Sequence, residues 1–183
     1  MIPGDRVRLR RIEKDDLVHF VAWLNDPDVR EGLATIYPLS LAHEEQWFES
    51  TLRLEPAAQP FAIEARLGTE SQPGDAWAPV GVVGFHGLDW RNRTGEVGIF
   101  IGRKHLWGKG HGTEALKALV RWAFQELNLN RVFLRVFEDN TRAIRSYEKV
   151  GFRVEGRLRQ DRFHNGRYFD TIVMGLLRDE FTR

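Results

Sequence analysis

The sequence predicts an α/β protein whose core is a mixed, mostly antiparallel sheet of seven strands with helices on both faces. Three observations indicate this class. Seven short runs with the alternating or apolar pattern of strands are interleaved with four amphipathic segments of helical spacing. A glycine-rich turn joins the run at residues 94–101 directly to one of these helices. Asn165-Gly166 separates the last two strand-like runs, which is a strong signal for a two-residue hairpin.

The elements follow one another in the order β-αα-βββ-α-β-α-ββ. The predicted strands comprise residues 7–12, 61–65, 80–85, 94–101, 131–136, 152–163 and 168–176. The predicted helices comprise residues 15–24, 41–54, 113–127 and 141–150. Ser40 is expected to cap the second helix, and Gly151 stands where a left-handed residue would end the fourth. Residues 68–79 are rich in Gly, Ser, Pro and Asp, and they predict a mobile loop.

The composition is that of one globular domain, which we expect to span residues 1–183. Apolar residues make up 42% of the chain and charged residues 29%, which are ordinary values for such a domain. No apolar run has membrane-spanning length and the N-terminus does not begin as a signal peptide does, so we expect a cytoplasmic protein without a membrane partner. The absence of cysteine excludes disulfides, zinc–thiolate sites and thiol catalysis. The six histidines are scattered, so no metal site is predicted.

The net charge of +1 hides an asymmetry between the two halves of the chain. Residues 1–102 carry 10 Lys and Arg against 16 Asp and Glu, whereas residues 103–183 carry 17 against 10. A basic C-terminal half suits an anionic cofactor, and an acidic N-terminal half suits a cationic acceptor. Two solvated faces of opposite sign would give the same composition. The asymmetry therefore matters only together with a specific anion site.

Such a site is predicted by the stretch Leu-Trp-Gly-Lys-Gly-His-Gly-Thr-Glu-Ala-Leu at residues 106–116. Glycines allow close approach of the backbone, and the N–H groups that open a helix point at an anion. The spacing does not match a nucleoside-triphosphate P-loop, because five residues separate Gly102 from Gly108 and Gly110 replaces the Ser or Thr. It does not match a Rossmann turn either, because the glycines follow the pattern G-x-G-x-G after three strands.

The stretch resembles the pyrophosphate loop of the GCN5-related N-acetyltransferases (GNAT family), which has the form [QR]-x-x-G-x-[GA]. Gly110-His111-Gly112 fills its second half, and Trp107 stands at the Gln/Arg position. A second stretch, residues 140–152, is similar to the family pattern N-x-x-[AS]-x-x-x-Y-x-K-x-G-F. The element order also agrees over nearly the whole chain. The resemblance is strongest to the branch with ribosomal-protein N-terminal acetyltransferases and spermidine acetyltransferase.

The resemblance implies that acetyl-CoA is the co-substrate and that no metal takes part. The backbone of the 94–101 strand would pair with pantetheine and polarise the thioester carbonyl, while the loop amides hold the pyrophosphate. The residues assigned to the cofactor in this way are Ile99, Phe100, Ile101, Trp107, Gly108, Lys109, Gly110, His111, Gly112, Thr113, Asn140, Arg142, Ala143 and Lys149. A glycine-rich turn that only joins a strand to a helix is the structural alternative, and Asn140 is equally a good helix cap.

Tyr147 is the candidate general acid that the second motif implies. A departing coenzyme A thiolate, with a pKa near ~8.5 by analogy with cysteine, can take a proton from a phenol of pKa about 10. A core tyrosine on the buried face of its helix would show the same spacing, so the alternative role is packing.

Glu96 is the candidate general base. An alkylamine of pKa about 10.4 is charged at pH 7, and its deprotonation costs ~4–5 kcal/mol before it can attack. Glu96 stands near the glutamate that the family carries on its fourth strand, although a solvent-facing residue at a strand's start is an equal alternative. His86 is the second candidate because its ordinary pKa lies near neutrality.

The predicted function is therefore acetyl transfer from acetyl-CoA to a primary amine: a protein N-terminus, a polyamine or another small amine. A non-catalytic acyl-CoA-binding sensor or scaffold is the alternative, and the presence of both Tyr147 and Glu96 favours the enzyme. Nucleic-acid binding is not predicted, because the arginines near the C-terminus match no reading motif. A homodimer is left open. The side chains that could attract a cationic acceptor are Asp26, Asp28, Glu31, Glu44 and Glu45.

Overall fold

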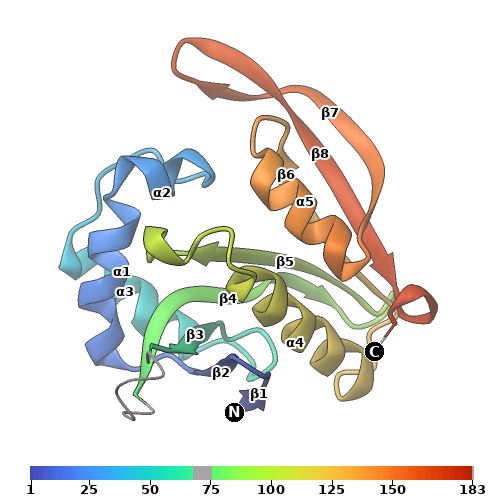
Figure 1. The fold of residues 1–183 in the computed structure, drawn as a ribbon, viewed down its shortest axis with the longest axis horizontal. Coiled ribbons are helices and arrows are strands. Elements are labelled where there is room, and N and C mark those ends of the chain that lie inside the picture. Colours follow the sequence, from blue (N-terminus) through green and yellow to red (C-terminus); the bar gives the residue numbers. More distant parts are fainter. Residues whose placement is uncertain (68–75, 183) are drawn as a thin grey trace. The chain divides into compact units, whose positions relative to one another are not determined.

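A computed structural model describes residues 1–67 and 76–182, shown as a ribbon in Figure 1. The strands are β1 (Ile2–Pro3), β2 (Val7–Arg11), β3 (Phe61–Arg66), β4 (Trp77–Asp89), β5 (Thr94–Ile101), β6 (Arg131–Phe137), β7 (Arg153–His164) and β8 (Arg167–Leu177). The α-helices are α1 (Leu17–Leu24), α2 (Pro27–Glu31), α3 (Leu41–Thr51), α4 (His111–Gln125) and α5 (Thr141–Val150). Three short 3-10 helices are η1 (Lys14–Asp16), η2 (Lys104–Leu106) and η3 (Arg178–Glu180).

The strands are hydrogen-bonded in the order β1-β2-β3-β4-β5-β6-β8-β7. β5 and β6 pair in parallel, whereas β1–β2, β2–β3, β3–β4, β6–β8 and β7–β8 pair antiparallel. The predicted α/β class with a mixed, mostly antiparallel sheet is therefore confirmed. Short connections join the antiparallel pairs β1–β2 and β7–β8, whereas the parallel β5–β6 ladder needs the helical crossover through α4.

The predicted number of seven strands is wrong, because the described residues form eight. The additional strand is β1, in which Ile2 and Pro3 pair with Leu9 and Arg8 of β2. A turn at Gly4, whose N–H donates to the Val7 carbonyl at 2.9 Å, brings these residues back onto β2. Two residues that include a proline cannot show an alternating pattern. This pairing is therefore decided by the turn and not by periodicity.

Most predicted boundaries agree with the structure within two or three residues. The mobile loop predicted at residues 68–79 is an exception: residues 68–75 lie outside the described residues, and Trp77–Pro79 belong to β4. The short helix α2 is not among the four predicted helices, and Asp26 caps it by accepting from the Asp28 N–H at 2.9 Å. Among the described helices, none is both long and apolar enough to cross a membrane.

The chain divides into two compact units. The first comprises residues 1–84 and 99–119, and the second comprises residues 85–98 and 120–183. The expectation of a single domain over residues 1–183 stays a prediction.

In the first unit, β2 and β3 bury their apolar side chains, and α1 and α3 pack on each other. Val7, Leu9, Ala62 and Ile63 are fully buried in these strands. Phe20 of α1 contributes to a cluster with Ile12, Leu17 and Ala62, against which aromatic side chains from α1 and α3 pack. Burying such side chains contributes roughly 1.5–3 kcal/mol each, which is enough to hold the helical segment against the strands.

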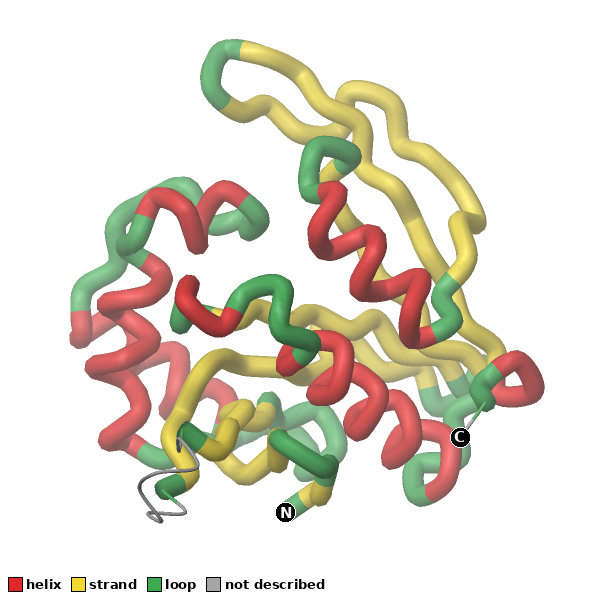
Figure 2. Tube along the Cα trace, in the orientation of Figure 1, coloured by secondary structure: helices red, strands yellow, loops and turns green. Residues whose placement is uncertain are grey.

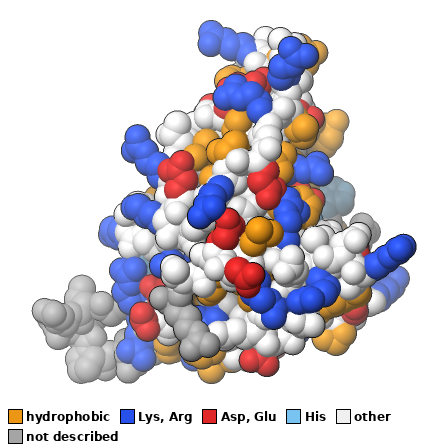
Figure 3. Space-filling model, turned by 90° about the vertical axis from the view of Figure 1, so that its right-hand side faces the viewer, with side chains coloured by type: hydrophobic (Ala, Val, Ile, Leu, Met, Phe, Trp, Pro, Cys, Tyr) orange, Lys and Arg blue, Asp and Glu red, His pale blue; other side chains and the backbone are white. Residues whose placement is uncertain are grey.

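In the second unit, β6 and β8 form the central ladder and α5 follows β6. Val132, Leu134, Met174 and Leu176 are at most 2% exposed and form its core. The predicted hairpin is confirmed: Asn165 and Gly166 have φ of 47° and 75°, as a type I′ turn requires. Arginines are frequent on this hairpin, and Lys and Arg side chains gather over its tip at the top of Figure 3.

Candidate active site

The glycine loop leaves β5 through η2 and enters α4 in the first unit (Figure 2). Gly108 and Gly110 have φ of 74° and 89°, a left-handed conformation that side chains with a Cβ rarely adopt. In the described part of the chain, the N–H groups of Gly108, Gly110, His111 and Gly112 have no backbone acceptor. A Cβ at Gly108 would meet nothing within 4 Å, so the loop is also open on its outer side. These residues therefore fit a pyrophosphate group.

Trp107 fastens this loop to β5. Its Nε1–H donates to the Ile101 carbonyl at 2.7 Å, and the N–H of Gly102 donates to the Val80 carbonyl at 2.8 Å. Gly102 is needed here because a Cβ would lie 2.0 Å from the Trp23 ring of α1. The indole at the family's Gln/Arg position thus has a structural partner of its own, and it closes the loop against the strand end.

His111 opens α4 and has an unusual environment. Burial, followed by the positive charge of Arg6, holds the pKa of His111 below its usual range, while its ring hydrogen bond to Leu106 acts in the opposite direction. Its Nδ1 atom is buried and has no partner among the described residues. The imidazole is therefore neutral at pH 7. The exposed side chain of Lys109 supplies a positive charge on the loop itself.

The β5–β6 ladder is shorter than β5 itself. The β5–β6 ladder contains three pairs, Thr94–Arg131, Gly95–Val132 and Glu96–Phe133, and then ends. β5 itself continues to Ile101, so the backbone from residue 97 to residue 101 lies beyond this ladder. A Cβ at Gly81 would lie 2.1 Å from the Phe100 carbonyl oxygen, so β4 approaches this strand at backbone distance.

Tyr147 lies on α5 in the second unit, and its ring packs edge-on against Phe152 with centroids 6.3 Å apart. Burial raises the pKa of Tyr147 to about 12. The phenol therefore keeps its proton at neutral and mildly alkaline pH, which is the state a general acid needs. The helix ends directly after it, because Gly151 at φ 113° and Phe152 both donate to the Tyr147 carbonyl. This is the predicted left-handed C-cap.

The remaining cofactor candidates of the second motif lie at the two ends of α5: Asn140, Arg142 and Ala143 at its start, and Lys149 in its last turn. Asn140 is the N-cap: its Oδ1 accepts from the Ala143 N–H at 3.2 Å, which leaves the NH₂ group for another partner. Arg142 and Lys149 are exposed, and Ala143 is half-buried. The capping role of Asn140 is thus observed, and a role in holding pantetheine stays a prediction.

Glu96 and His86 are both in the second unit. Glu96 is half-buried on β5 and forms an ion pair with Arg135 of β6, with Nε and Oε1 3.4 Å apart. The His86 ring approaches β5 at Gly98 with its Nε2 edge, since a Cβ at residue 98 would be only 2.0 Å from Nε2. Residues 96 and 98 face the same side of β5 because side chains alternate along a strand. Both candidate bases therefore lie on one face of this strand.

The acidic side chains considered for acceptor binding have structural partners in the first unit. Lys104 pairs with Asp26 at 2.8 Å and with Asp28 at 2.7 Å, and Lys14 pairs with Glu45 at 3.2 Å. Glu44 is 5% exposed, and burial raises its pKa. These carboxylates are thus largely compensated or buried.

Sequence reasoning missed two residues at the glycine loop, Arg6 and Glu114. The Glu114 carboxylate accepts from the backbone N–H groups of Arg6 and Val7 and from Arg6 Nε. Arg6 Nη1 in turn donates to the Lys109 carbonyl. More than a hundred residues separate these partners in the chain, and no local pattern could connect them. Within residues 1–67 and 76–182, no group of His, Asp or Glu side chains could hold a metal ion.

Unpaired amides at a helix start suit the diphosphate of a nucleotide-derived cofactor, and a protonated phenol suits a thiolate leaving group. Each feature is one that an acyl-CoA-dependent acyltransferase needs, and the comparison with known families establishes that class. The family model "Acetyltransferase (GNAT) domain" matches residues 6–153, so the chain belongs to the GNAT family. It is an N-acetyltransferase that uses acetyl-CoA and transfers the acetyl group to an amine.

Relatives and solved structures agree with this membership. An uncharacterized N-acetyltransferase, p20, of Bacillus licheniformis is 31% identical over 97% of this chain and 96% of its own length. The spermidine N(1)-acetyltransferase of Escherichia coli K12 is 37% identical over 49% of this chain and 48% of its own length. A crystal structure of spermidine N-acetyltransferase from Vibrio cholerae, in complex with CoA and spermine, is similar with a TM-score of 0.83. It is 25% identical and covers 96% of this chain and 97% of that one.

Proposed function

We propose that the chain acetylates a small cationic amine, with Tyr147 as general acid and Glu96 as general base. The observation that carries the proposal is the left-handed glycine loop, whose N–H groups at Gly108, Gly110, His111 and Gly112 have no backbone acceptor in the described part of the chain. Gly110, His111 and Gly112 are half-buried. Half-buried N–H groups without an acceptor are costly in a folded protein, so a ligand that accepts these hydrogen bonds is favoured.

The loop amides and the N-terminus of α4 hold the pyrophosphate of coenzyme A. Lys109 adds a positive charge, and the helix dipole contributes roughly 0.3–1 kcal/mol for an anion placed there. The backbone of Ile99, Phe100 and Ile101 offers partners to pantetheine, although the Ile101 carbonyl already accepts from Trp107. Acetyl-CoA, when bound, supplies an acetyl group activated as a thioester.

Glu96 and Tyr147 carry the protons of the reaction. Glu96 accepts a proton from the ammonium group, so that the amine nitrogen can form a bond to the acetyl carbonyl carbon. The carbon–sulfur bond then breaks, and Tyr147 Oη gives its proton to the departing sulfur. The second proton that the nitrogen loses in becoming an amide restores the tyrosine hydroxyl. The raised pKa of Tyr147 keeps its proton in place until the sulfur departs.

A polyamine is the acceptor that we propose first. The similarity to the Vibrio cholerae enzyme in complex with CoA and spermine supports a small amine. A protein N-terminus is the second candidate acceptor. A homodimeric state and a cytoplasmic location are further proposals, which sedimentation of the purified chain and fractionation of cells can test.

The test is an amine panel with acetyl-CoA, in which a thiol reagent detects released coenzyme A. The panel contains polyamines, aminoglycosides and peptides with free N-termini. If the chain turns over polyamines faster than every other amine in the panel, the proposal is supported. If it turns over peptides alone, the acceptor is a protein N-terminus and not a polyamine. Thermal unfolding with millimolar acetyl-CoA is measured in parallel. Stabilisation without turnover of any amine would contradict the proposed catalysis, and no shift at all would contradict cofactor binding.

A further inference from the structure

Glu114 places a negative charge where the cofactor loop must bind an anion. It lies in the first turn of α4, close to the N–H groups that open the helix, and its side chain is only 17% exposed. An uncompensated carboxylate at this position would repel the phosphates, because like charges at short distance are unfavourable in a partly buried site. A phosphate site at this helix therefore requires that Glu114 be neutralised.

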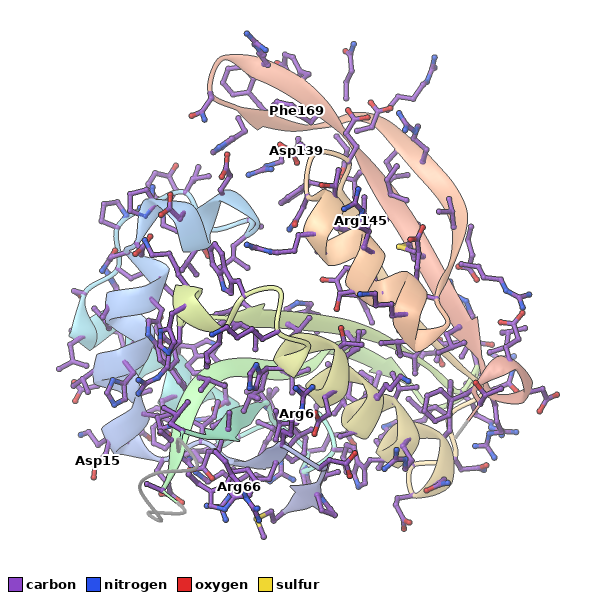
Figure 4. All side chains as sticks on the ribbon, in the orientation of Figure 1. Arg6, Asp15, Arg66, Asp139, Arg145 and Phe169 are labelled. Atoms are coloured by element: carbon purple, nitrogen blue, oxygen red, sulfur yellow. The ribbon has the colours of Figure 1, made fainter. Side chains whose placement is uncertain are left out.

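Arg6 supplies that neutralisation from the segment before β2 (labelled in Figure 4). Its Nε donates to Glu114 Oε2 at 3.1 Å, and the backbone N–H groups of Arg6 and Val7 donate to Oε1 at 2.5 and 3.1 Å. Arg6, Val7 and Glu114 all belong to the first unit. The carboxylate is thus held by three hydrogen bonds, of which the one from Arg6 Nε is also an ion pair.

The same guanidinium also orients a peptide of the loop. Arg6 Nη1 donates to the Lys109 carbonyl at 3.2 Å. The peptide between Lys109 and Gly110 is trans, and in a trans peptide the C=O and N–H groups point in opposite directions. Because the Lys109 carbonyl points to Arg6, the Gly110 N–H points away from Arg6. That N–H is one of the groups without a backbone acceptor in the described residues.

The surroundings of Gly110 and Trp107 are consistent with this role of Arg6. A Cβ at Gly110 would lie 3.0 Å from Arg6 Nη2, so the glycine makes room for the guanidinium in addition to allowing φ 89°. Trp107 occupies the position of the family's Gln or Arg, and its indole N–H is used on Ile101. Arg6 is then a cationic side chain that reaches the loop from elsewhere in the chain.

We propose that Arg6 is a positioning residue for the coenzyme A loop, which neutralises Glu114 and turns the Gly110 N–H toward the phosphates. The inference rests on the proposed function, since it concerns the loop that holds coenzyme A. It assigns to Arg6 no contact with the reacting atoms. Its loss should weaken cofactor affinity and leave the chemical step unchanged.

The test compares Arg6→Gln, Glu114→Gln and the double variant by calorimetric titration with coenzyme A alone. Arg6→Gln leaves the Glu114 charge beside the phosphates, and we expect the Kd to rise about tenfold, which corresponds to ~1.4 kcal/mol. Glu114→Gln removes the repelling charge and should bind at least as tightly as the wild type. The double variant should recover most of the affinity that Arg6→Gln loses. Arg53→Gln, which removes an exposed arginine elsewhere in the first unit, is the matched control.

If the ion pair between Arg6 and Glu114 only stabilises the fold, the Kd and Tm values of the variants should differ from those expected above. In that case Arg6→Gln and Glu114→Gln would lower the Tm and weaken binding alike, and the double variant would bind no better than either. That pattern, or an unchanged Kd in Arg6→Gln, overturns the inference. Kinetics give a second readout: the KM for acetyl-CoA should rise in Arg6→Gln, with kcat and the KM for the amine unchanged. A wild-type chain that does not bind coenzyme A would overturn the proposed function itself, which distinguishes the two failures.

Discussion

Replacing Tyr147 with phenylalanine removes one hydroxyl from a half-buried ring and leaves the packing against Phe152 in place. If Tyr147 protonates the departing sulfur, kcat should fall by about 10²–10⁴-fold, the range that a general acid contributes. The Kd for coenzyme A should not change. The Tm should stay within about 3 °C, because an aromatic ring of the same shape fills the site.

The pH dependence makes this prediction specific to the structure. Burial raises the pKa of Tyr147 to about 12, so the acid form persists where an ordinary phenol would begin to ionise. At about pH 9.5 an unperturbed tyrosine would be roughly one-quarter ionised, whereas a group of pKa about 12 is less than about 1% ionised. The ratio of wild-type to Tyr147→Phe kcat should therefore be constant from about pH 7 to about pH 10.

The assay is steady-state kinetics at saturating acetyl-CoA and amine over this pH range, with coenzyme A release followed by a thiol reagent. An equal kcat in both proteins would show that Tyr147 only packs in the fold and is not the general acid. A ratio that shrinks with an apparent pKa near 10 would show that the hydroxyl ionises as in water, and it would refute the reasoning from burial.

Three further predictions concern the bases and one cap. Glu96→Gln should lower kcat/KM at neutral pH and flatten the acidic limb of the pH–rate profile; an intact limb would transfer the role to His86 or a water. Gly98→Ala puts a Cβ 2.0 Å from His86 Nε2 and must displace that ring. With Glu96 as the base, kcat should change by less than about threefold even if the Tm falls, whereas a loss of about a hundredfold would identify His86 as the base. Gly151→Ala should cost about 1–2 kcal/mol of unfolding free energy in urea titrations, because its φ is 113°. Gly156→Ala, where a Cβ meets nothing within 4 Å, is the control, and equal effects would show that backbone strain is not the cause.

Local pattern predicted most elements of this fold. Alternation marked β2, helical spacing marked α4 and α5, and Asn165-Gly166 marked the hairpin, because side-chain direction and turn conformation repeat with a fixed local pattern along the chain. Where the pattern is too short, prediction failed. β1 has two residues, and its pairing with β2 depends on a turn at Gly4.

The residues of the candidate site likewise divide into those that a local pattern predicted and those that it did not. The glycine spacing and the Asn140–Phe152 motif predicted the loop, the cap and the tyrosine, since each is a property of one continuous segment. The acidic residues of the first unit show the limit of this approach. Asp26 and Asp28 were predicted as candidates for attracting a cation. Lys104, more than seventy residues away in the sequence, already pairs with both.

The sequence by itself thus determined the cofactor class, because a phosphate loop is built from consecutive residues whose conformations are set by glycine and by the start of a helix. Only the tertiary structure decided how the loop's charge is balanced. Arg6 meets Glu114 and Lys109 across 108 and 103 residues. Such a contact forms when the folded chain brings β2 beside α4, and no periodicity along the sequence encodes that approach.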